Sequence, residues 1–280
     1  MTTVPVEPGA ELVPRRSPAA AARVAFGALL LRDLVVLRKT LKEFIPRTLL
    51  QPFLLVFVFT YVFPKIGQGV GGASGESEFS TILVAGVVAL AIMFQGIQTV
   101  ALPMVNEFGF TREIEDRVLA PLPIAMVAIQ KAVWGSLASL LSALLVFPIA
   151  AVVPATPVHL DVSWPVLLTL TPLCCYMCGA LGLFFGTRFD PRTVPLLFGI
   201  IVIPITFLGA IYYPWQALEP IRWLQILVLA NPLVYMCEGF RAALTDSPHM
   251  SLWVVYPVLV AFSVLFTWQG IKGFTRRVVS

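Results

Sequence analysis

Residues 81–105, TILVAGVVALAIMFQGIQTVALPMV, decide the fold of this chain. The stretch has 25 residues and no charged side chain. A helix that crosses a bilayer needs roughly 20 apolar residues, so this run is long enough to span a membrane. Four further uncharged runs of similar length cover residues 132–160, 162–187, 193–218 and 250–271. We therefore predict an all-α integral membrane protein.

The composition of the whole chain agrees with a lipid environment. Of its 280 residues, 58% are hydrophobic and 12% are charged, and the mean hydropathy is +0.89. Soluble domains carry roughly 25% charged residues, so this composition is typical of a protein whose solvent is lipid. Residues 44–63 form a sixth apolar run, which only Arg47 interrupts near its start. The sequence therefore predicts six transmembrane helices.

A seventh apolar run, residues 223–237, is too short to cross the bilayer and carries Asn231-Pro232 in its middle. Proline breaks a helix, so we predict an extracellular re-entrant hairpin before the last span. Glu238 and Arg241 follow at i,i+3 spacing and can pair on one helix face. Because a charge at membrane depth is costly unless paired, the pair either holds the hairpin closed or acts as an extracellular gate.

The positions of the basic residues orient the chain. With the N-terminus in the cytoplasm, 16 of the 19 lysines and arginines lie on the inner side, and Lys65, Arg222 and Arg241 lie on the outer side. The positive-inside rule then places both termini in the cytoplasm of a multi-pass protein of the plasma membrane. The net charge of +4 faces the anionic lipids of the inner leaflet, so the basic character requires no nucleic-acid partner.

The chain before the first span divides into two parts. Residues 1–18 contain four prolines and no apolar segment, which predicts a disordered cytoplasmic tail. Residues 19–43 have the pattern of a basic amphipathic helix that lies in the membrane interface, and residues 44–280 form the transmembrane domain. This elbow helix either anchors the topology or also contacts a partner protein. Its apolar face carries Phe26, Leu30, Leu34, Leu37 and Leu41.

Residues 107–117, EFGFTREIEDR, are strongly charged although long apolar runs flank them. The orientation above places this stretch in the cytoplasm, between the second and third spans. Glu113 and Arg117 have i,i+4 spacing, which stabilises a helix, and Pro121 and Pro123 end it. The stretch is either a solvated loop that charge keeps out of the membrane or a short helix that transmits force from a soluble partner.

The sequence of this loop, EIEDRVLAPLP followed by IAMVAIQK, resembles the cytoplasmic coupling-helix region of type-2 ABC transporter permeases. The matching positions are Arg112, Glu113, Glu115, Leu119, Pro121, Leu122, Gln130 and Lys131. Pro123 stands where many members of the family have serine or threonine, which affects the expected geometry of the turn.

A second stretch, NPLVYMCEGFRAAL at residues 231–244, resembles the segment that precedes the last span in the same family. The matching positions are Asn231, Pro232, Tyr235, Glu238, Gly239 and Arg241. The order of an elbow helix, five spans, an extracellular hairpin and a last span is also similar. The resemblance covers about residues 20–277 and is greatest for drug, lipid and nodulation-type export permeases, such as the daunorubicin efflux permeases.

The resemblance implies the permease subunit of an ATP-driven exporter, which moves an amphipathic drug, lipid or lipid-linked glycan out of the cytoplasm or the inner leaflet. It implies separate ATPase subunits and a second permease, identical or not, to form a dimer within membrane lipid. The residues expected to couple to the ATPase are Glu107, Arg112, Glu113, Glu115, Asp116, Arg117, Leu119 and Pro121. The residues expected at the extracellular gate are Asn231, Pro232, Tyr235, Glu238 and Arg241.

The chain carries no sequence signal for chemistry of its own. The nucleotide-binding pattern GxxxxGK[ST] does not occur, so we expect no cofactor in this chain and ATP with magnesium on the partner subunit. A GxGxxG pattern at residues 67–72 follows a predicted span and is interpreted as an external loop. Cys175 and Cys178 form a CxxC pair inside a predicted span, where packing is a better explanation than a metal site. No catalytic residues are predicted.

Two other classes of protein were weighed. An ion-coupled secondary transporter needs acidic side chains or broken helices near the bilayer midplane, and spans two, four and five lack both. A membrane-embedded enzyme needs a catalytic group of residues, which the histidines His159 and His249 and the lone Glu238 do not form. The transporter remains the main alternative to an exporter permease.

Overall fold

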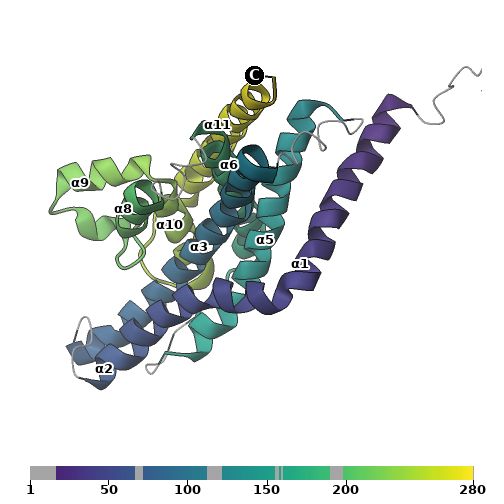
Figure 1. Ribbon diagram of the computed structural model, residues 1–280. Helices are drawn as coiled ribbons and strands as arrows, with labels where there is room; N and C mark the ends of the chain where they lie inside the picture. The colour runs from purple at the N-terminus through teal and green to yellow at the C-terminus, as the bar shows by residue number, and fades with distance from the viewer. Residues whose placement is uncertain are drawn as a thin grey trace, which may run out of the picture.

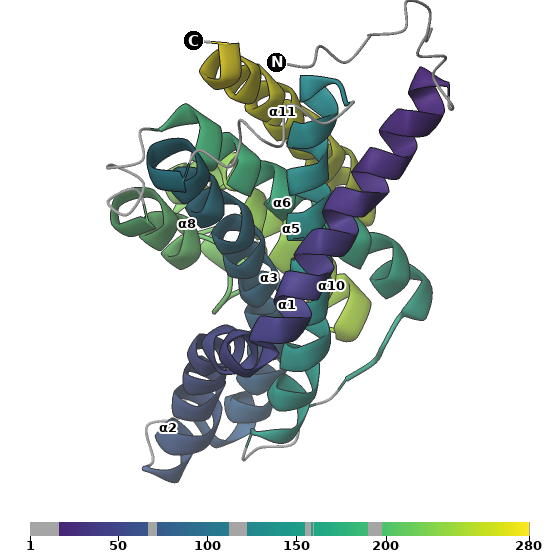
Figure 2. The same ribbon diagram turned by 45° about the vertical axis from the view of Figure 1, so that its right-hand side comes forward.

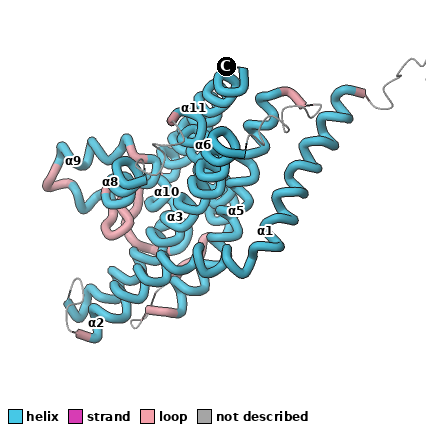
Figure 3. Tube along the Cα trace, viewed as in Figure 1, coloured by secondary structure: helices cyan, strands magenta, loops and turns pink. Residues whose placement is uncertain are grey.

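The computed structural model describes residues 17–66, 72–111, 122–154, 158, 160–189 and 198–279. Helices and the loops between them make up this part of the chain, and no β-strand occurs in it (Figure 3). The expected all-α class is therefore confirmed. Four of these helices are long and apolar enough to cross a membrane, and a fifth candidate results if one bent helix pair is counted as a span.

The four long helices pack against one another as a bundle (Figures 1 and 2). They are α3 (Gly72–Asn106), α5 (Ile124–Val152), α6 (Trp164–Arg188) and α11 (Leu252–Val279). Helix α3 is buried along most of its length and contacts both α5 and α6, while α6 also contacts α11. These helices correspond to four of the six predicted spans.

Helix α5 differs from its prediction at both ends. The apolar run predicted a span over residues 132–160, but the helix covers Ile124–Val152. It begins after Pro123 and includes Lys131, whose side chain is buried. A charged residue was taken as the boundary of the apolar run, but the helix passes through it because protein atoms rather than lipid surround that side chain.

Helix α1 (Pro18–Val56) joins two elements that the sequence separated. The predicted boundary between residues 43 and 44 lies inside this one helix, which continues as the π-helical η1 (Phe57–Val62) and ends with α2 (Phe63–Lys65). Pro46 and Pro52 lie within α1, and Figure 1 shows that the helix bends along its length. A proline thus bends this helix without ending it. Helix α1 packs against α5 and α3.

The segment predicted as the fifth span, residues 193–218, is only partly described. Residues 193–197 lie outside the described part of the chain. The remainder forms the π-helical η3 (Phe198–Val202) and the short α8 (Ile203–Phe207), followed by irregular backbone and the 3₁₀ turn η4 (Trp215–Leu218). Neither this segment nor α1 is among the four long apolar helices, so six spans are not established.

The predicted break at Asn231-Pro232 is present. Helix α9 (Arg222–Leu227) and the 3₁₀ turn η5 (Val228–Ala230) precede it, and α10 (Pro232–Leu244) follows. The two halves meet at an angle of 96°. Helix α10 packs against α3, α11 and α6, so the second half of the hairpin is part of the core.

Small residues allow α3, α5 and α6 to approach closely. A β-carbon added at Gly179 of α6 would lie 2.2 Å from the carbonyl oxygen of Ala132 in α5, and one added at Gly96 of α3 would lie 2.7 Å from the β-carbon of Cys178. These distances are too short for any side chain. These close approaches matter because packing drives helix association in lipid.

Replacing Gly179 with alanine tests this packing. We expect Gly179→Ala to lower the free energy of unfolding by about 1–3 kcal/mol, because the new methyl group meets backbone atoms that cannot move aside. Gly27→Ala is the matched control, since nothing lies within 4 Å of a β-carbon at Gly27 in α1. Thermal unfolding of both variants in detergent measures the difference, and equal midpoints would contradict the close approach.

Candidate functional site

The predicted coupling segment begins where α3 ends. After Asn106 the chain continues as the π-helical turn η2 (Glu107–Thr111), and residues 112–121 lie outside the described part of the chain. Of the predicted coupling residues, the structure therefore places Glu107 alone. The others, outside the described residues, are Arg112, Glu113, Glu115, Asp116, Arg117, Leu119 and Pro121.

Glu107 is buried and forms an ion pair with Lys131 of α5. The side chains are 8% and 5% exposed, respectively, so neither lies on an open surface. Removing either partner would leave the other charge buried without its counter-ion, which is strongly unfavourable. The pair therefore ties the start of the charged segment to the bundle and holds it in one place.

Neighbouring contacts tie the same region to two more helices, α11 and α6. The ring of Phe108 in η2 packs edge-on against Phe274 of α11 at 5.7 Å between centroids, and the guanidinium of Arg277 lies 5.4 Å above the Phe108 ring. Arg277 also donates to the carbonyl oxygens of Gly186 and Phe189 at the end of α6. These contacts connect η2 to α11 and α6 as well as to α5.

One contact in this region joins α1 to α5. The Nε2 atom of Gln130 donates to Oδ2 of Asp33 at 2.8 Å, and both side chains are buried. Gln130 is part of the coupling-region pattern in the sequence, whereas Asp33 belongs to no motif that was predicted there. The sequence offered one clue to this contact, namely that Asp33 is an acidic residue within a mostly basic helix. The periodicity of that helix did not show that Asp33 faces α5.

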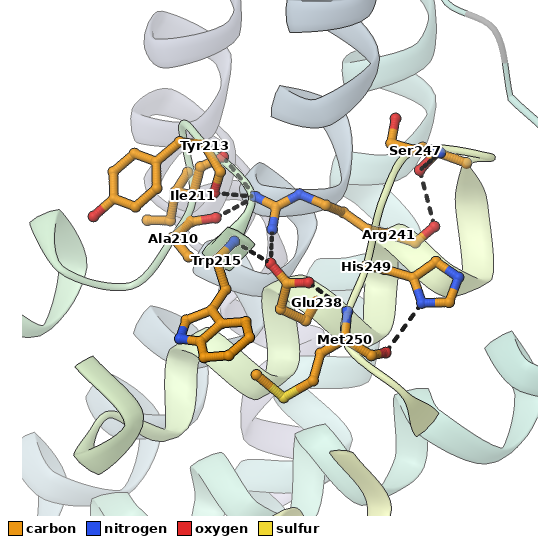
Figure 4. A network of polar contacts seen from close by, with 10 residues as sticks. Ala210, Ile211, Tyr213, Trp215, Glu238, Arg241, Ser247, His249 and Met250 are labelled. Carbon is orange, nitrogen blue, oxygen red and sulfur yellow. Dashed lines mark hydrogen bonds and ion pairs between the residues drawn. The ribbon is translucent and has the colours of Figure 1, made fainter. Parts of the chain in front are cut away.

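At the hairpin, a fully buried ion pair joins two residues of α10. The side chains of Glu238 and Arg241 have no exposed surface. Nη1 of Arg241 lies 2.5 Å from Oε1 of Glu238 (Figure 4). The sequence predicted this i,i+3 pairing, and the structure confirms it. The charges are shielded from lipid by the protein around them.

Each partner of this pair also binds backbone from outside α10. Arg241 Nη2 donates to the carbonyl oxygens of Ala210 and Tyr213, in the irregular segment after α8. The carboxylate of Glu238 accepts from the backbone N–H of Trp215 and of Met250, each at 2.7 Å (Figure 4). Met250 lies just before α11. The pair therefore holds the chain between α8 and η4, helix α10 and the start of α11 in one arrangement.

The bend itself is held by Asn231 and Tyr235. The side-chain oxygen of Asn231 caps α10 by accepting from the N–H of Leu233 at 3.0 Å, and its amide donates to the carbonyl oxygen of Ile205 at 2.7 Å. The hydroxyl of Tyr235 donates to the carbonyl oxygen of Leu229, on the other side of the bend, at 3.0 Å. Pro232 is the first residue of α10. All five residues predicted for the gate thus lie together in the hairpin.

These two regions hold parts of the chain in place, and their described residues form no arrangement typical of catalysis. The carboxylates and cations in both are used in ion pairs and backbone hydrogen bonds. The four cysteines are buried and unpaired, and within the described residues no cluster of three or more metal-ligating side chains is found.

Comparison with known proteins gives the family. A sequence model of the family described as ABC-2 type transporter matches residues 24–245, which include both regions. The chain belongs to the ABC-2 type transporter family. It is similar to the inner membrane transport permease YadH of Escherichia coli (strain K12) and to the protein of that name from Shigella flexneri. In each case 29% of 223 residues are identical, over 79% of this chain and 84% of that protein.

Membership of the ABC-2 family confirms the resemblance found in the sequence. Together with the long apolar helices it establishes a multi-pass membrane protein of the permease type. In this ABC-2 chain each stretch that carried the resemblance contains a residue of a buried ion pair. The first stretch ends at Lys131, which pairs with Glu107, and the second contains both Glu238 and Arg241.

Removing one partner of the hairpin pair is expected to destabilise this ABC-2 chain. We expect Arg241→Met and Glu238→Met each to lower the free energy of unfolding by about 3–5 kcal/mol, because each leaves a buried charge without its counter-ion. The double variant should lose less than the sum of the two changes, since it leaves neither charge behind. Unfolding in detergent measures all three variants. Arg222→Met, at an exposed position of α9, is the control, and additive losses would show that the pair is not coupled.

Proposed function

We propose that the chain is the permease subunit of an ATP-driven exporter, which moves an amphipathic substrate out of the cytoplasm or the inner leaflet. A separate ATPase subunit would bind ATP and magnesium. The family match supports a transport role, and the anchoring of η2 by the buried pair Glu107–Lys131 is the observation that carries the mechanism. A segment that must transmit force needs a rigid connection to the helices that it moves.

In this proposal residues 112–121 bind the ATPase and the buried residues behind them receive its movement. Glu107 is too buried to contact a soluble partner, so its role is to connect the segment to α5. Phe108 and Arg277 extend the connection to α11. Closure of the ATPase subunits around ATP would then displace η2 together with the ends of several helices.

The topology in the proposal has six spans and both termini in the cytoplasm. The part of α1 that follows its bend, with η1, would be the first span, and residues 193–218 would contain the fifth. The start of α1, the start of α5 and the end of α11 lie at one end of the bundle, and α2 lies at the other (Figures 1 and 2). This arrangement supports a shared cytoplasmic side for the two termini and the charged segment.

The proposal assigns the hairpin to the outer half of the path. Two permeases, identical or different, would face each other, and the substrate would leave between them. The Glu238–Arg241 pair fastens α10 to both the segment after α8 and the start of α11, so these pieces would move together when the permeases separate. Asn231 and Tyr235 would keep the bend rigid during that movement.

Binding of an ATPase tests the charged segment. A candidate ABC ATPase subunit from the same organism is co-expressed with the permease and purified with it in detergent. We expect the ATPase to co-purify with the wild type and to be lost with Glu113→Arg/Asp116→Arg, because the charge reversal disrupts the docking surface. Glu219→Arg, at an exposed position that the proposal places outside the cell, is the matched control.

Two results would contradict this proposal in different ways. If the ATPase binds the double variant as it binds the wild type, the charged segment is a solvated loop. If no ATPase from the organism binds the wild type, an ion-coupled secondary transporter becomes the better explanation, and transport in proteoliposomes under an ion gradient would then be measured.

Force transmission is tested at the buried pair. We expect Glu107→Gln and Lys131→Gln to keep the ATPase bound but to abolish ATP-dependent export of a fluorescent amphiphile, because the connection between η2 and α5 is broken. The exchange Glu107→Lys/Lys131→Glu restores an ion pair and should recover part of the export. Export by either single variant at the wild-type rate would show that the pair only stabilises the fold.

A further inference from the structure

Polar side chains of α1 and α3 meet at the surface of the bundle. Arg47 Nη2 donates to the side-chain oxygen of Gln98 at 3.3 Å, and the hydroxyl of Thr48 donates to the side-chain oxygen of Gln95 at 3.0 Å. The amide of Gln95 in turn donates to the hydroxyl of Thr99 at 2.7 Å. These residues of α3 belong to the 25-residue run without charge, where such a group is unexpected.

A shallow cleft opens beside this group and has two unlike ends. The cleft has a volume of about 20 Å³. Arg47, Gln51 and Gln98 line its polar end, and the half-buried Phe94 lines its apolar end together with Leu90, whose side chain is 1% exposed. Leu90, Phe94 and Gln98 are four residues apart and therefore lie along one face of α3. In the proposed topology the polar end is nearer the cytoplasm and the apolar end is nearer the bilayer midplane. An amphiphile of the inner leaflet has the same orientation.

No acidic side chain of the described residues balances the charge of Arg47. Its side chain is exposed, and within the described residues its one hydrogen bond goes to Gln98. Glu43, one turn earlier in α1, forms no ion pair with it. Gln98 lies roughly 14 Å along α3 from Glu107, given a rise of 1.5 Å per residue. In the proposed topology Arg47 lies beside the membrane-spanning part of α3, where a cation is costly unless a counter-charge is supplied.

The shape of the guanidinium group indicates which counter-charge fits. Arginine presents five N–H donors in a planar fork that matches a carboxylate or a phosphate, and Arg47 uses one of them on Gln98. The exposed amide of Gln51 lines the same end of the cleft and can add a donor. A cationic amphiphile would instead meet a like charge at this position.

We propose that Arg47, Gln51 and Gln98 bind the anionic group of the transported amphiphile, a phosphate or a carboxylate, while its apolar chain lies along Phe94. This inference rests on the proposed function for the statement that the ligand is transported, and it narrows the substrate to anionic amphiphiles. The binding step itself requires only the permease.

Binding is measured on the purified permease without any ATPase. The probes are dodecyl phosphate, dodecyltrimethylammonium, which has the same chain and the opposite charge, and inorganic phosphate. We expect the wild type to bind dodecyl phosphate at least tenfold more tightly than either other probe. Arg47→Gln should weaken that binding tenfold or more, as the loss of a charge-assisted hydrogen bond predicts. Arg38→Gln, an exposed arginine of the same helix, is the control and should bind as the wild type does.

Two further variants separate recognition from misfolding. Arg47→Glu should reverse the preference and favour dodecyltrimethylammonium, which a variant that merely fails to fold cannot do. Gln98→Leu keeps the charge but removes the amide that positions it, so its affinity should lie between those of the wild type and Arg47→Gln. Equal affinities of the wild type and Arg47→Gln for dodecyl phosphate would overturn the site, and so would equal binding of the two charged probes.

The source of the anion is decided by two more results. If inorganic phosphate binds as tightly as dodecyl phosphate, the ligand of the site is a free anion, and the proposal that it is an amphiphile is wrong. If ATP hydrolysis by the complex does not move bound dodecyl phosphate across the membrane of proteoliposomes, the ligand is a resident lipid. The proposal that the bound amphiphile is the transported substrate is then wrong. Absence of any ATPase partner would contradict the proposed exporter but would leave the binding results unchanged, so the two failures are distinguishable.

Discussion

Lipid offers no partner to a charged or hydrogen-bonding group, and this constraint determines where such groups occur in the structure. The bundle contains two buried ion pairs, Glu107–Lys131 and Glu238–Arg241, among its described residues. Each lies where the chain changes direction, and each joins segments that the helices alone would not hold together. Buried ion pairs contribute little net stability compared with apolar packing, but they strongly disfavour any arrangement in which one partner is lost. They therefore specify which segments move as one unit.

Helix α3 connects these two units. Its end continues into η2, where Glu107 binds Lys131, and helix α10 with its own ion pair packs against it. Between them, close contacts at Gly96 and Gly179 bind α3 and α6 to α5 with little space for adjustment. A densely packed helix bundle deforms little, so in the proposed mechanism a displacement at one end would be carried along α3 rather than absorbed. The same close packing explains why the apolar helices need no strong polar contacts between them.

The sequence predicted those features that depend on local pattern. Four apolar runs became long helices, Asn231-Pro232 became a sharp break, and the i,i+3 spacing of Glu238 and Arg241 became an ion pair. The predictions were wrong where a tertiary contact allowed a residue to lie in a place that its side chain alone would disfavour. Lys131 was taken as the edge of an apolar run, yet a partner on η2 allows it to lie inside α5. The packing of distant segments decides which backbone groups bind Arg241 and places Asp33 against α5. A single sequence does not reveal that packing.

The two ion pairs and Arg47 differ in burial and in whether an acidic side chain neutralises the positive charge. That difference separates structural roles from a binding role. Glu238 with Arg241 and Glu107 with Lys131 are withdrawn from solvent and neutralised within the protein. Arg47 instead remains exposed beside a cleft, with an amide as its hydrogen-bond partner. No acidic side chain of the described residues pairs with it, in contrast to the two buried pairs. A cation of that kind is stabilised when an anion arrives from outside the chain, and the apolar wall beside it selects an anion that carries a hydrocarbon chain.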